Sequence, residues 1–152
     1  MLTTNGETME YIKTCINDSI SCKKEILTDA GIINNIKIAA DKIADVVENK
    51  GKIICCGNGG SAADAQHLAA EFVSRFEIER DALPAISLTT DTSIITAIGN
   101  DYGFEHLFSR QLQALGICND VLVAISTSGK SKNVLNGIRK AKSLGIFTIG
   151  LS

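Results

Sequence analysis

A glycine-rich turn between an apolar run and a helical pattern constrains this chain more than any other feature. Residues 52–56 form a short apolar run of the kind that makes a buried parallel strand. The turn at residues 57–60 contains three glycines, which let the backbone bend sharply and let a ligand approach it closely. Ser61 and Asp64 then make a Ser-x-x-Asp helix start, with Ser61 as the expected cap. This order of elements predicts a site for an anion or a polyol.

Three ionisable residues share one face of the helix expected over residues 61–76. Asp64, His67 and Glu71 are three and four positions apart, a spacing that puts them on one side of a helix. An imidazole and a carboxylate one turn apart suit a shared metal ion or an acid–base pair. The structural alternative is a surface pair that stabilises the helix only slightly. The glycine-rich turn upstream favours the functional interpretation, because it places a pocket beside this face.

A second loop, at residues 126–131, reads Ser-Thr-Ser-Gly-Lys-Ser and separates a strand pattern from a helix pattern. Its four hydroxyls, the free backbone N–H groups and the helix dipole all favour a phosphate dianion. The Gly-x-x-x-x-Gly-Lys pattern of a P-loop is missing, so a nucleotide triphosphate site is not predicted. The alternative is a serine-rich helix cap that binds no ligand.

Strand and helix patterns alternate along the chain, which predicts an α/β fold with a parallel sheet and helices on both faces. The expected strands cover residues 52–56, 85–88, 120–125 and 146–151. Ligands of such sheets bind at the carboxyl ends of the strands, where both loops lie. Asn58, with Asn100 and Asp101 in an expected polar loop at residues 99–103, suits the hydroxyls of an open-chain sugar. Each of the three has an alternative role as a turn residue.

Two helical patterns precede the first strand. They cover residues 7–29 and 32–49, with Gly31 as the expected interruption and Gly51 as the expected C-terminal stop. The first has a narrow apolar stripe and is expected to pack at least partly on another subunit. Folding onto its own sheet is the alternative.

Composition excludes several classes of protein. The 152 residues carry a net charge of −2, so no broad basic surface points to nucleic acid. No apolar run reaches the length of a membrane span and no signal peptide pattern is present, so a cytoplasmic location is expected. The five cysteines form no Cys-x-x-Cys pair and are expected to be reduced apolar fillers.

Together these motifs resemble the phosphoheptose isomerases, enzymes of the sugar isomerase (SIS) fold. The resemblance covers essentially the whole chain, and it is specific because several motifs recur in the right order and spacing. The matching segments are residues 57–61 with Asp64, His67 and Glu71, then residues 99–104, and then residues 126–129.

The resemblance implies an isomerase that converts sedoheptulose 7-phosphate to D-glycero-D-manno-heptose 7-phosphate through an enediol, for bacterial lipopolysaccharide or capsule heptose. It implies Glu71 as the catalytic base and a zinc ion held by His67 and Glu71. The substrate-binding residues that it implies are Asn58, Gly59, Gly60, Glu71, Asn100, Asp101, Ser126, Thr127, Ser128 and Ser131.

It also implies a homotetramer. Residues 1–50 are expected to be a helical oligomerisation segment and residues 51–152 the SIS sugar-phosphate-binding part, and the two together are expected to form one structural domain. In the family, a further glycine-rich loop and a helix with a Gln and a His complete the metal site. This chain ends at Ser152, so the metal site and the cover of the sheet are expected to be incomplete. The protein is therefore expected to associate.

Two other functions stay open at this point. A related SIS-fold protein binds the bacterial replication initiator and is not an isomerase, but that branch lacks the glutamate that is present here as Glu71. The third function is a phosphosugar-sensing SIS module without turnover.

Overall fold

The computed structural model describes residues 5–152, with side chains from residue 8 onward. The chain separates into two compact units, Met1–Ala40 and Asp41–Ser152. No helix in the described part of the chain is both long enough and apolar enough to cross a membrane. The elements are, in order, α1 (Asn5–Thr28), α2 (Ala30–Glu48), β1 (Ile53–Cys56), α3 (Gly60–Val73), β2 (Ala85–Ser87), α4 (Thr92–Asp101), the 3-10 turn η1 (Phe104–His106), α5 (Leu107–Leu115), β3 (Val121–Ile125), α6 (Lys132–Ser143) and β4 (Phe147–Leu151).

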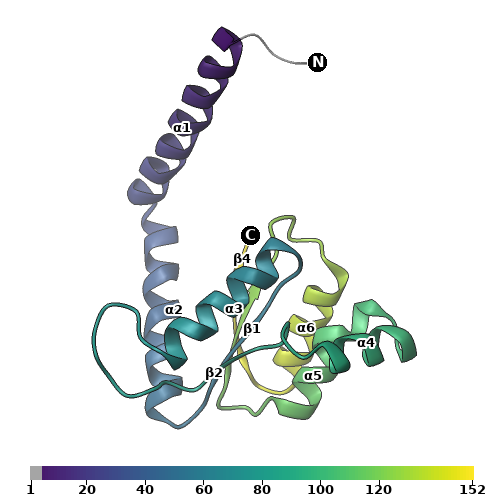
Figure 1. Ribbon diagram of the computed structural model, residues 1–152. Coiled ribbons are helices and arrows are strands. Elements are labelled where there is room, and N and C mark those ends of the chain that lie inside the picture. The colour runs from purple at the N-terminus through teal and green to yellow at the C-terminus, as the bar shows by residue number, and fades with distance from the viewer. Residues whose placement is uncertain (1–4) are drawn as a thin grey trace. The chain divides into compact units, whose positions relative to one another are not determined.

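The four strands form one parallel sheet in the order β2-β1-β3-β4. Figure 1 shows the sheet with α3 on one side and α6 on the other. This confirms the predicted α/β architecture with a parallel sheet. The central strands β1 and β3 are buried along almost their whole length, which explains their uninterrupted apolar sequences. β4 lies at one edge of the sheet, with Phe147 and Leu151 exposed.

Helices cover both faces of the sheet. Successive residues of β1 point to opposite faces, so this one strand contributes to two cores. Ile54 and Cys56 pack in the core formed with α5 and α6. Ile53 and Cys55 pack in the core formed with α3 and the last turns of α2. Burial raises the pKa of the Cys55 and Cys56 thiols to about 12, so both are protonated at neutral pH. The prediction that the cysteines are apolar fillers is confirmed for Cys55 and Cys56, on opposite faces of β1, but Cys15, Cys22 and Cys118 are exposed in the single chain, so for these three it is wrong.

The break between the two N-terminal helices lies at Asp29 and not at Gly31, so the expected interruption was placed wrongly. The Asp29 carboxylate accepts hydrogen bonds from the backbone N–H groups of Gly31, at 2.8 Å, and Ile32, at 3.0 Å. Because an aspartate at this position caps the first turn of a helix, α2 begins directly after it.

The C-terminal stop of α2 also differs from the expectation. Lys50, with φ 62°, takes the left-handed conformation that was expected of Gly51. The N–H groups of Lys50 and Gly51 bond back to the carbonyls of Val47 and Val46, a Schellman arrangement. Gly51 is needed for space, because a Cβ there would lie 1.9 Å from the carbonyl oxygen of Asn119.

An apolar stripe on α1 is open to solvent in the single chain. Met9, Ile12, Ile16 and Ile20 follow helical spacing and are 45–56% exposed. Side chains of this kind are normally buried, so the stripe supports the expectation that α1 packs on another subunit, which stays a prediction.

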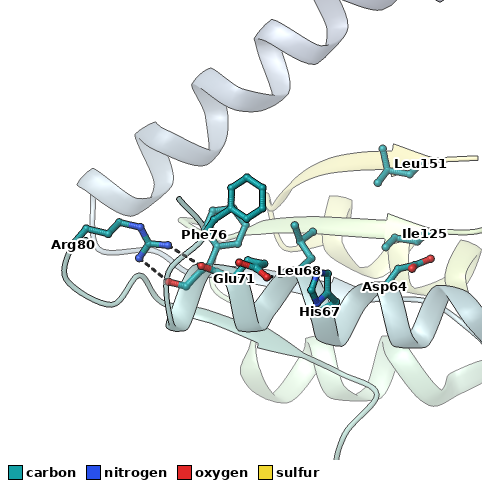
Figure 2. Close-up of a pocket in the computed structure, with 9 residues that line it drawn as sticks. Asp64, His67, Leu68, Glu71, Phe76, Arg80, Ile125 and Leu151 are labelled. Carbon is teal, nitrogen blue, oxygen red and sulfur yellow. Dashed lines mark hydrogen bonds and ion pairs between the residues drawn. The ribbon is translucent and has the colours of Figure 1, made fainter. Parts of the chain in front are cut away.

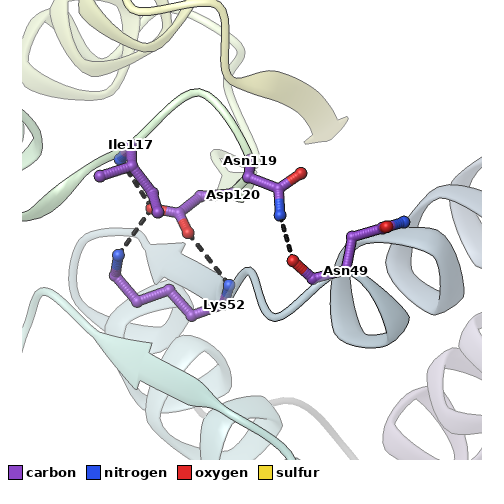
Figure 3. A network of polar contacts seen from close by, with 5 residues as sticks. All are labelled: Asn49, Lys52, Ile117, Asn119 and Asp120. Atoms are coloured by element: carbon purple, nitrogen blue, oxygen red, sulfur yellow. Dashed lines mark hydrogen bonds and ion pairs between the residues drawn. The ribbon is translucent and has the colours of Figure 1, made fainter.

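A polar network holds the amino-terminal ends of β1 and β3 (Figure 3). The side chain of Asp120 is 0% exposed and accepts from Lys52 Nζ at 2.7 Å. It also accepts from the backbone N–H of Lys52, at 3.0 Å, and of Ile117, at 2.9 Å. The Asn119 amide donates to the carbonyl of Asn49. These contacts tie the chain before each central strand to its neighbour.

Candidate functional site

The turn after β1 brings the backbone close to the start of α3. Gly59 has φ 55°, a left-handed conformation that glycine adopts without strain. A Cβ on Gly57 would lie 2.5 Å from the carbonyl oxygen of Ser61, so only glycine fits there. The capping prediction was wrong: α3 begins at Gly60 after Gly59, no side chain caps it, and Ser61 is buried within its first turn.

The face of α3 that carries the ionisable residues borders a cavity of about 490 Å³, shown in Figure 2. His67 Nε2 lies 3.5 Å from Glu71 Oε1, one helical turn away. The His67 side chain is 77% exposed and the Glu71 side chain 30% exposed. Asp64 lines the same cavity, so the predicted three-residue face is formed as expected. The rest of the wall is mostly apolar and comprises Leu68, Phe72, Phe76, Ile125 and Leu151, with Arg80.

Arg80, in the segment after α3, folds back and bonds the last turn of α3 beside this cavity (Figure 2). Its guanidinium donates to the carbonyl oxygens of Glu71 at 2.8 Å and Phe72 at 2.9 Å. It also donates to the carbonyl of Asp81 at 2.9 Å. A cation is favourable at a helix C-terminus, where carbonyl groups lack intrahelical partners. Sequence reasoning missed this role, because nothing in the sequence marks which loop residue folds back onto the helix.

His67 and Glu71 are the two residues expected to hold a metal ion. Zinc usually takes four ligands. Among the described residues no group of three or more His, Cys, Asp or Glu side chains is placed to hold a metal ion. The described residues alone therefore do not fit a complete zinc site, although His67 and Glu71 present two donors on one face.

The serine-rich loop at residues 126–131 joins β3 to α6 at the carboxyl edge of the sheet. Its ends are close together, because Ser126 Oγ donates to Ser131 Oγ at 3.2 Å and the Gly129 N–H donates to the Ser126 carbonyl at 2.9 Å. Gly129 has φ 61°. Ser126 and Ser131 line a cavity of about 140 Å³, whereas Thr127 and Ser128 are exposed. Leu151 lines both this cavity and the larger one beside Glu71, so the two lie next to each other.

Asn58 connects the two loops. Its amide and the amide of Asn133 exchange two hydrogen bonds, each 2.8 Å long. Asn133 lies in the first turn of α6 and is 3% exposed. Sequence reasoning missed Asn133. A signal was available, because an asparagine inside a helix that otherwise buries Val134, Gly137 and Ala141 is out of place in an apolar face.

Asn100 and Asp101 lie elsewhere than expected. The predicted polar loop at residues 99–103 is wrong, because α4 continues to Asp101 and contains both residues in its last turn. The Asn100 amide donates to the Asp101 carboxylate at 2.8 Å. Both are exposed, and neither lines the cavity beside Glu71 or the one beside Ser126. Their binding role stays a prediction.

Known proteins share this sequence and fold. The sequence profile of the SIS domain matches residues 20–152. The phosphoheptose isomerase of Aneurinibacillus thermoaerophilus is 54% identical over 94% of this chain and 72% of its own length. That of Campylobacter concisus is 50% identical over 93% of this chain and 75% of its own.

Solved structures agree with the sequence relatives. A phosphoheptose isomerase from Neisseria gonorrhoeae superposes with a TM-score of 0.86 at 45% identity, covering 94% of this chain and 73% of its own. One from Francisella tularensis has a TM-score of 0.88 at 39% identity, covering 94% and 74%. The chain therefore belongs to the SIS-domain family and, within it, to the phosphoheptose isomerases, which are aldose–ketose isomerases.

Proposed function

We propose that this chain converts sedoheptulose 7-phosphate to D-glycero-D-manno-heptose 7-phosphate, for bacterial heptose that enters lipopolysaccharide or capsule. The observation that carries the proposal is the adjacency of two cavities that meet at Leu151, the last residue of β4. One holds His67 and Glu71, which suit proton transfer, and the other is lined by the hydroxyls of Ser126 and Ser131. A sugar phosphate needs these two chemistries at its two ends.

The phosphate would lie against the loop at residues 126–131. Ser126 and Ser131 offer hydroxyls at the N-terminus of α6, and the exposed Thr127 and Ser128 add two more donors. The positive end of the helix dipole favours a dianion at this point. Binding at this end holds the reacting carbons in position, which lowers the barrier of the chemical step.

Glu71 would move the proton between C1 and C2 of the sugar. Deprotonating C1 of the ketose forms an enediol, and returning a proton to C2 gives the aldose. His67, 3.5 Å from the Glu71 carboxylate, is placed to hold the base or to share a proton with it. Asn58, Gly59 and Gly60 would bind the sugar oxygens at the turn after β1, and Asn100 and Asp101 remain proposed binding residues.

Zinc, the cofactor that the resemblance implies, would take His67 and Glu71 as two of its ligands. When bound it would polarise the sugar oxygens. The homotetramer and the cytoplasmic location are likewise proposals. The exposed apolar stripe of α1 supports the first.

The test is conversion of sedoheptulose 7-phosphate, followed by proton NMR, with added zinc and with a chelator. Sedoheptulose without its phosphate is the matched substrate control. We expect aldose from the phosphorylated sugar and a large loss of kcat/KM for the other sugar. Binding of sedoheptulose 7-phosphate without any aldose would instead favour a phosphosugar-sensing SIS module. If the chain neither binds nor converts the sugar, a protein-binding function is favoured, like that of the related SIS-fold protein that binds the replication initiator.

A further inference from the structure

The side chain of Asn133 lies outside the motifs that carry the proposed reaction and yet touches one of them. We propose that Asn133 is a positioning residue that orients the Asn58 amide and couples the sugar-binding turn to the phosphate-binding loop. The inference rests on the proposed function, because it assigns a role within the same site.

Three hydrogen bonds fix the orientation of both side-chain amides, first that of Asn133 and through it that of Asn58. The backbone N–H of Val134 donates to Asn133 Oδ1 at 2.9 Å, which determines where the oxygen of this amide lies. The same oxygen accepts from Asn58 Nδ2 at 2.8 Å, and Asn133 Nδ2 donates to Asn58 Oδ1 at 2.8 Å. The α6 backbone thereby sets Asn133, and Asn133 sets Asn58.

Asn58 keeps hydrogen-bonding capacity for a ligand. An amide side chain has two N–H donors and an oxygen with two lone pairs. The oxygen of Asn133 is saturated by its two donors, and this side chain is 3% exposed. Asn58 uses one donor and one lone pair on Asn133 and is only half-buried, so one donor and one lone pair stay available. Because the pair holds the amide in one orientation, these groups point in defined directions.

The pair also joins elements that are far apart in the chain. Asn58 follows β1 directly, and Asn133 comes two residues after Ser131 in the first turn of α6. β1 and β3 are neighbours in the sheet, so the pair bridges the two loops that follow them. A phosphate bound at the N-terminus of α6 would therefore contact the same helical turn whose Asn133 side chain holds Asn58.

The test compares the wild-type chain with Asn133→Asp, Asn58→Ala and the double variant. Aspartate keeps the size of asparagine and both bonds to its oxygen, but it cannot donate to Asn58 Oδ1. We expect Asn133→Asp to raise KM for sedoheptulose 7-phosphate about tenfold, the effect of one hydrogen bond, while kcat changes less than about threefold. The double variant should lose no more kcat/KM than the more impaired single variant, because the two residues act as a unit.

Asn136→Asp is the matched control, because Asn136 lies one turn further along α6 and donates to the carbonyl of Glu105. A purely structural role would lower the melting temperature and the active fraction without raising KM. The inference is overturned if Asn133→Asp leaves KM within about twofold of wild type, if the losses in the double variant multiply, or if Asn136→Asp raises KM equally.

A second measurement separates this inference from the proposed function. If the wild-type chain does not turn over, the proposed function fails. Wild type, Asn133→Asp and the control Asn136→Asp are then compared by NMR titration with sedoheptulose 7-phosphate, following the side-chain amide signals of Asn58. We expect these signals to shift in the wild type and the Kd to rise about tenfold in Asn133→Asp. An unchanged Kd, or no binding by the wild type, overturns the inference.

Discussion

The two edges of the sheet differ in how far the protein itself uses the hydrogen-bonding groups of their polar side chains. At the amino-terminal edge, the fully buried Asp120 carboxylate accepts three hydrogen bonds, one of them from Lys52 Nζ at 2.7 Å. At the carboxyl edge, Asn58 is only partly buried and retains one donor and one lone pair that no described residue uses. The difference indicates that the first edge holds the central strands together, whereas the second is built to bind a ligand. Substitutions at the two edges should therefore change different quantities.

The largest effect on stability is expected from Asp120→Ala at the amino-terminal edge. Removing the carboxylate leaves Lys52 and two backbone N–H groups without their acceptor. We expect a loss of about 3 kcal/mol in the free energy of unfolding, measured with urea, because Lys52 remains partly exposed and regains some hydration. Glu77→Ala, at an exposed carboxylate, is the control. A loss below about 1 kcal/mol would contradict a structural role for this edge.

Removing one hydroxyl at the carboxyl edge should change binding and leave stability nearly intact. Ser126→Ala and Ser131→Ala each delete a donor to the proposed phosphate, so we expect KM for sedoheptulose 7-phosphate to rise about tenfold. The free energy of unfolding should change by less than about 0.5 kcal/mol. Ser143→Ala removes a hydroxyl at the other end of α6, where it bonds the Lys140 carbonyl, and should leave KM unchanged. An unchanged KM in both site variants would place the phosphate elsewhere.

Arg80→Lys tests whether Arg80, which lines the larger cavity, also holds the last turn of α3 in place. Lysine has no planar fork and cannot hold the carbonyls of Glu71 and Phe72 as arginine does. We expect a loss of about 1 kcal/mol in stability and faster hydrogen exchange in the last turn of α3. Arg139→Lys, at an exposed position of α6, is the control. Equal exchange rates in α3 for wild type and Arg80→Lys would show that Arg80 does not fasten this helix.

Alkaline pH should also lower the stability of the fold, through the two buried thiols of β1. The folded pKa of Cys55 and Cys56 is about 12, above the ordinary value of 9.0. A raised pKa stabilises the folded state below about pH 9, and this contribution is lost as pH rises toward 12. At pH 10 we expect the two thiols to cost about 1 kcal/mol each. Urea unfolding at pH 8 and pH 10 should therefore show a steeper fall for wild type than for the Cys55→Ala/Cys56→Ala double variant. Parallel falls would contradict the burial argument.

The sequence predicted the elements better than the contacts between them. The parallel sheet and both loops at its carboxyl edge followed from apolar runs and glycine spacing, which are local signals. The Ser61 cap failed because Gly59 and Gly60 already start α3, and the loop at residues 99–103 failed because α4 continues through Gly99. The Asn58–Asn133 pair joins residues 75 positions apart, and such pairing depends on strand order rather than on local propensity.

The central claim is that Glu71 moves the proton of the sugar, and isomerisation in D₂O tests it most directly. Wild type, Glu71→Gln and the control His106→Ala, at an exposed residue outside both cavities, are incubated with sedoheptulose 7-phosphate and followed by proton NMR. We expect wild type and the control to form aldose carrying deuterium at C2. Glu71→Gln should bind the sugar but form aldose at least about 100-fold more slowly. Aldose formation by Glu71→Gln at the wild-type rate would contradict the account.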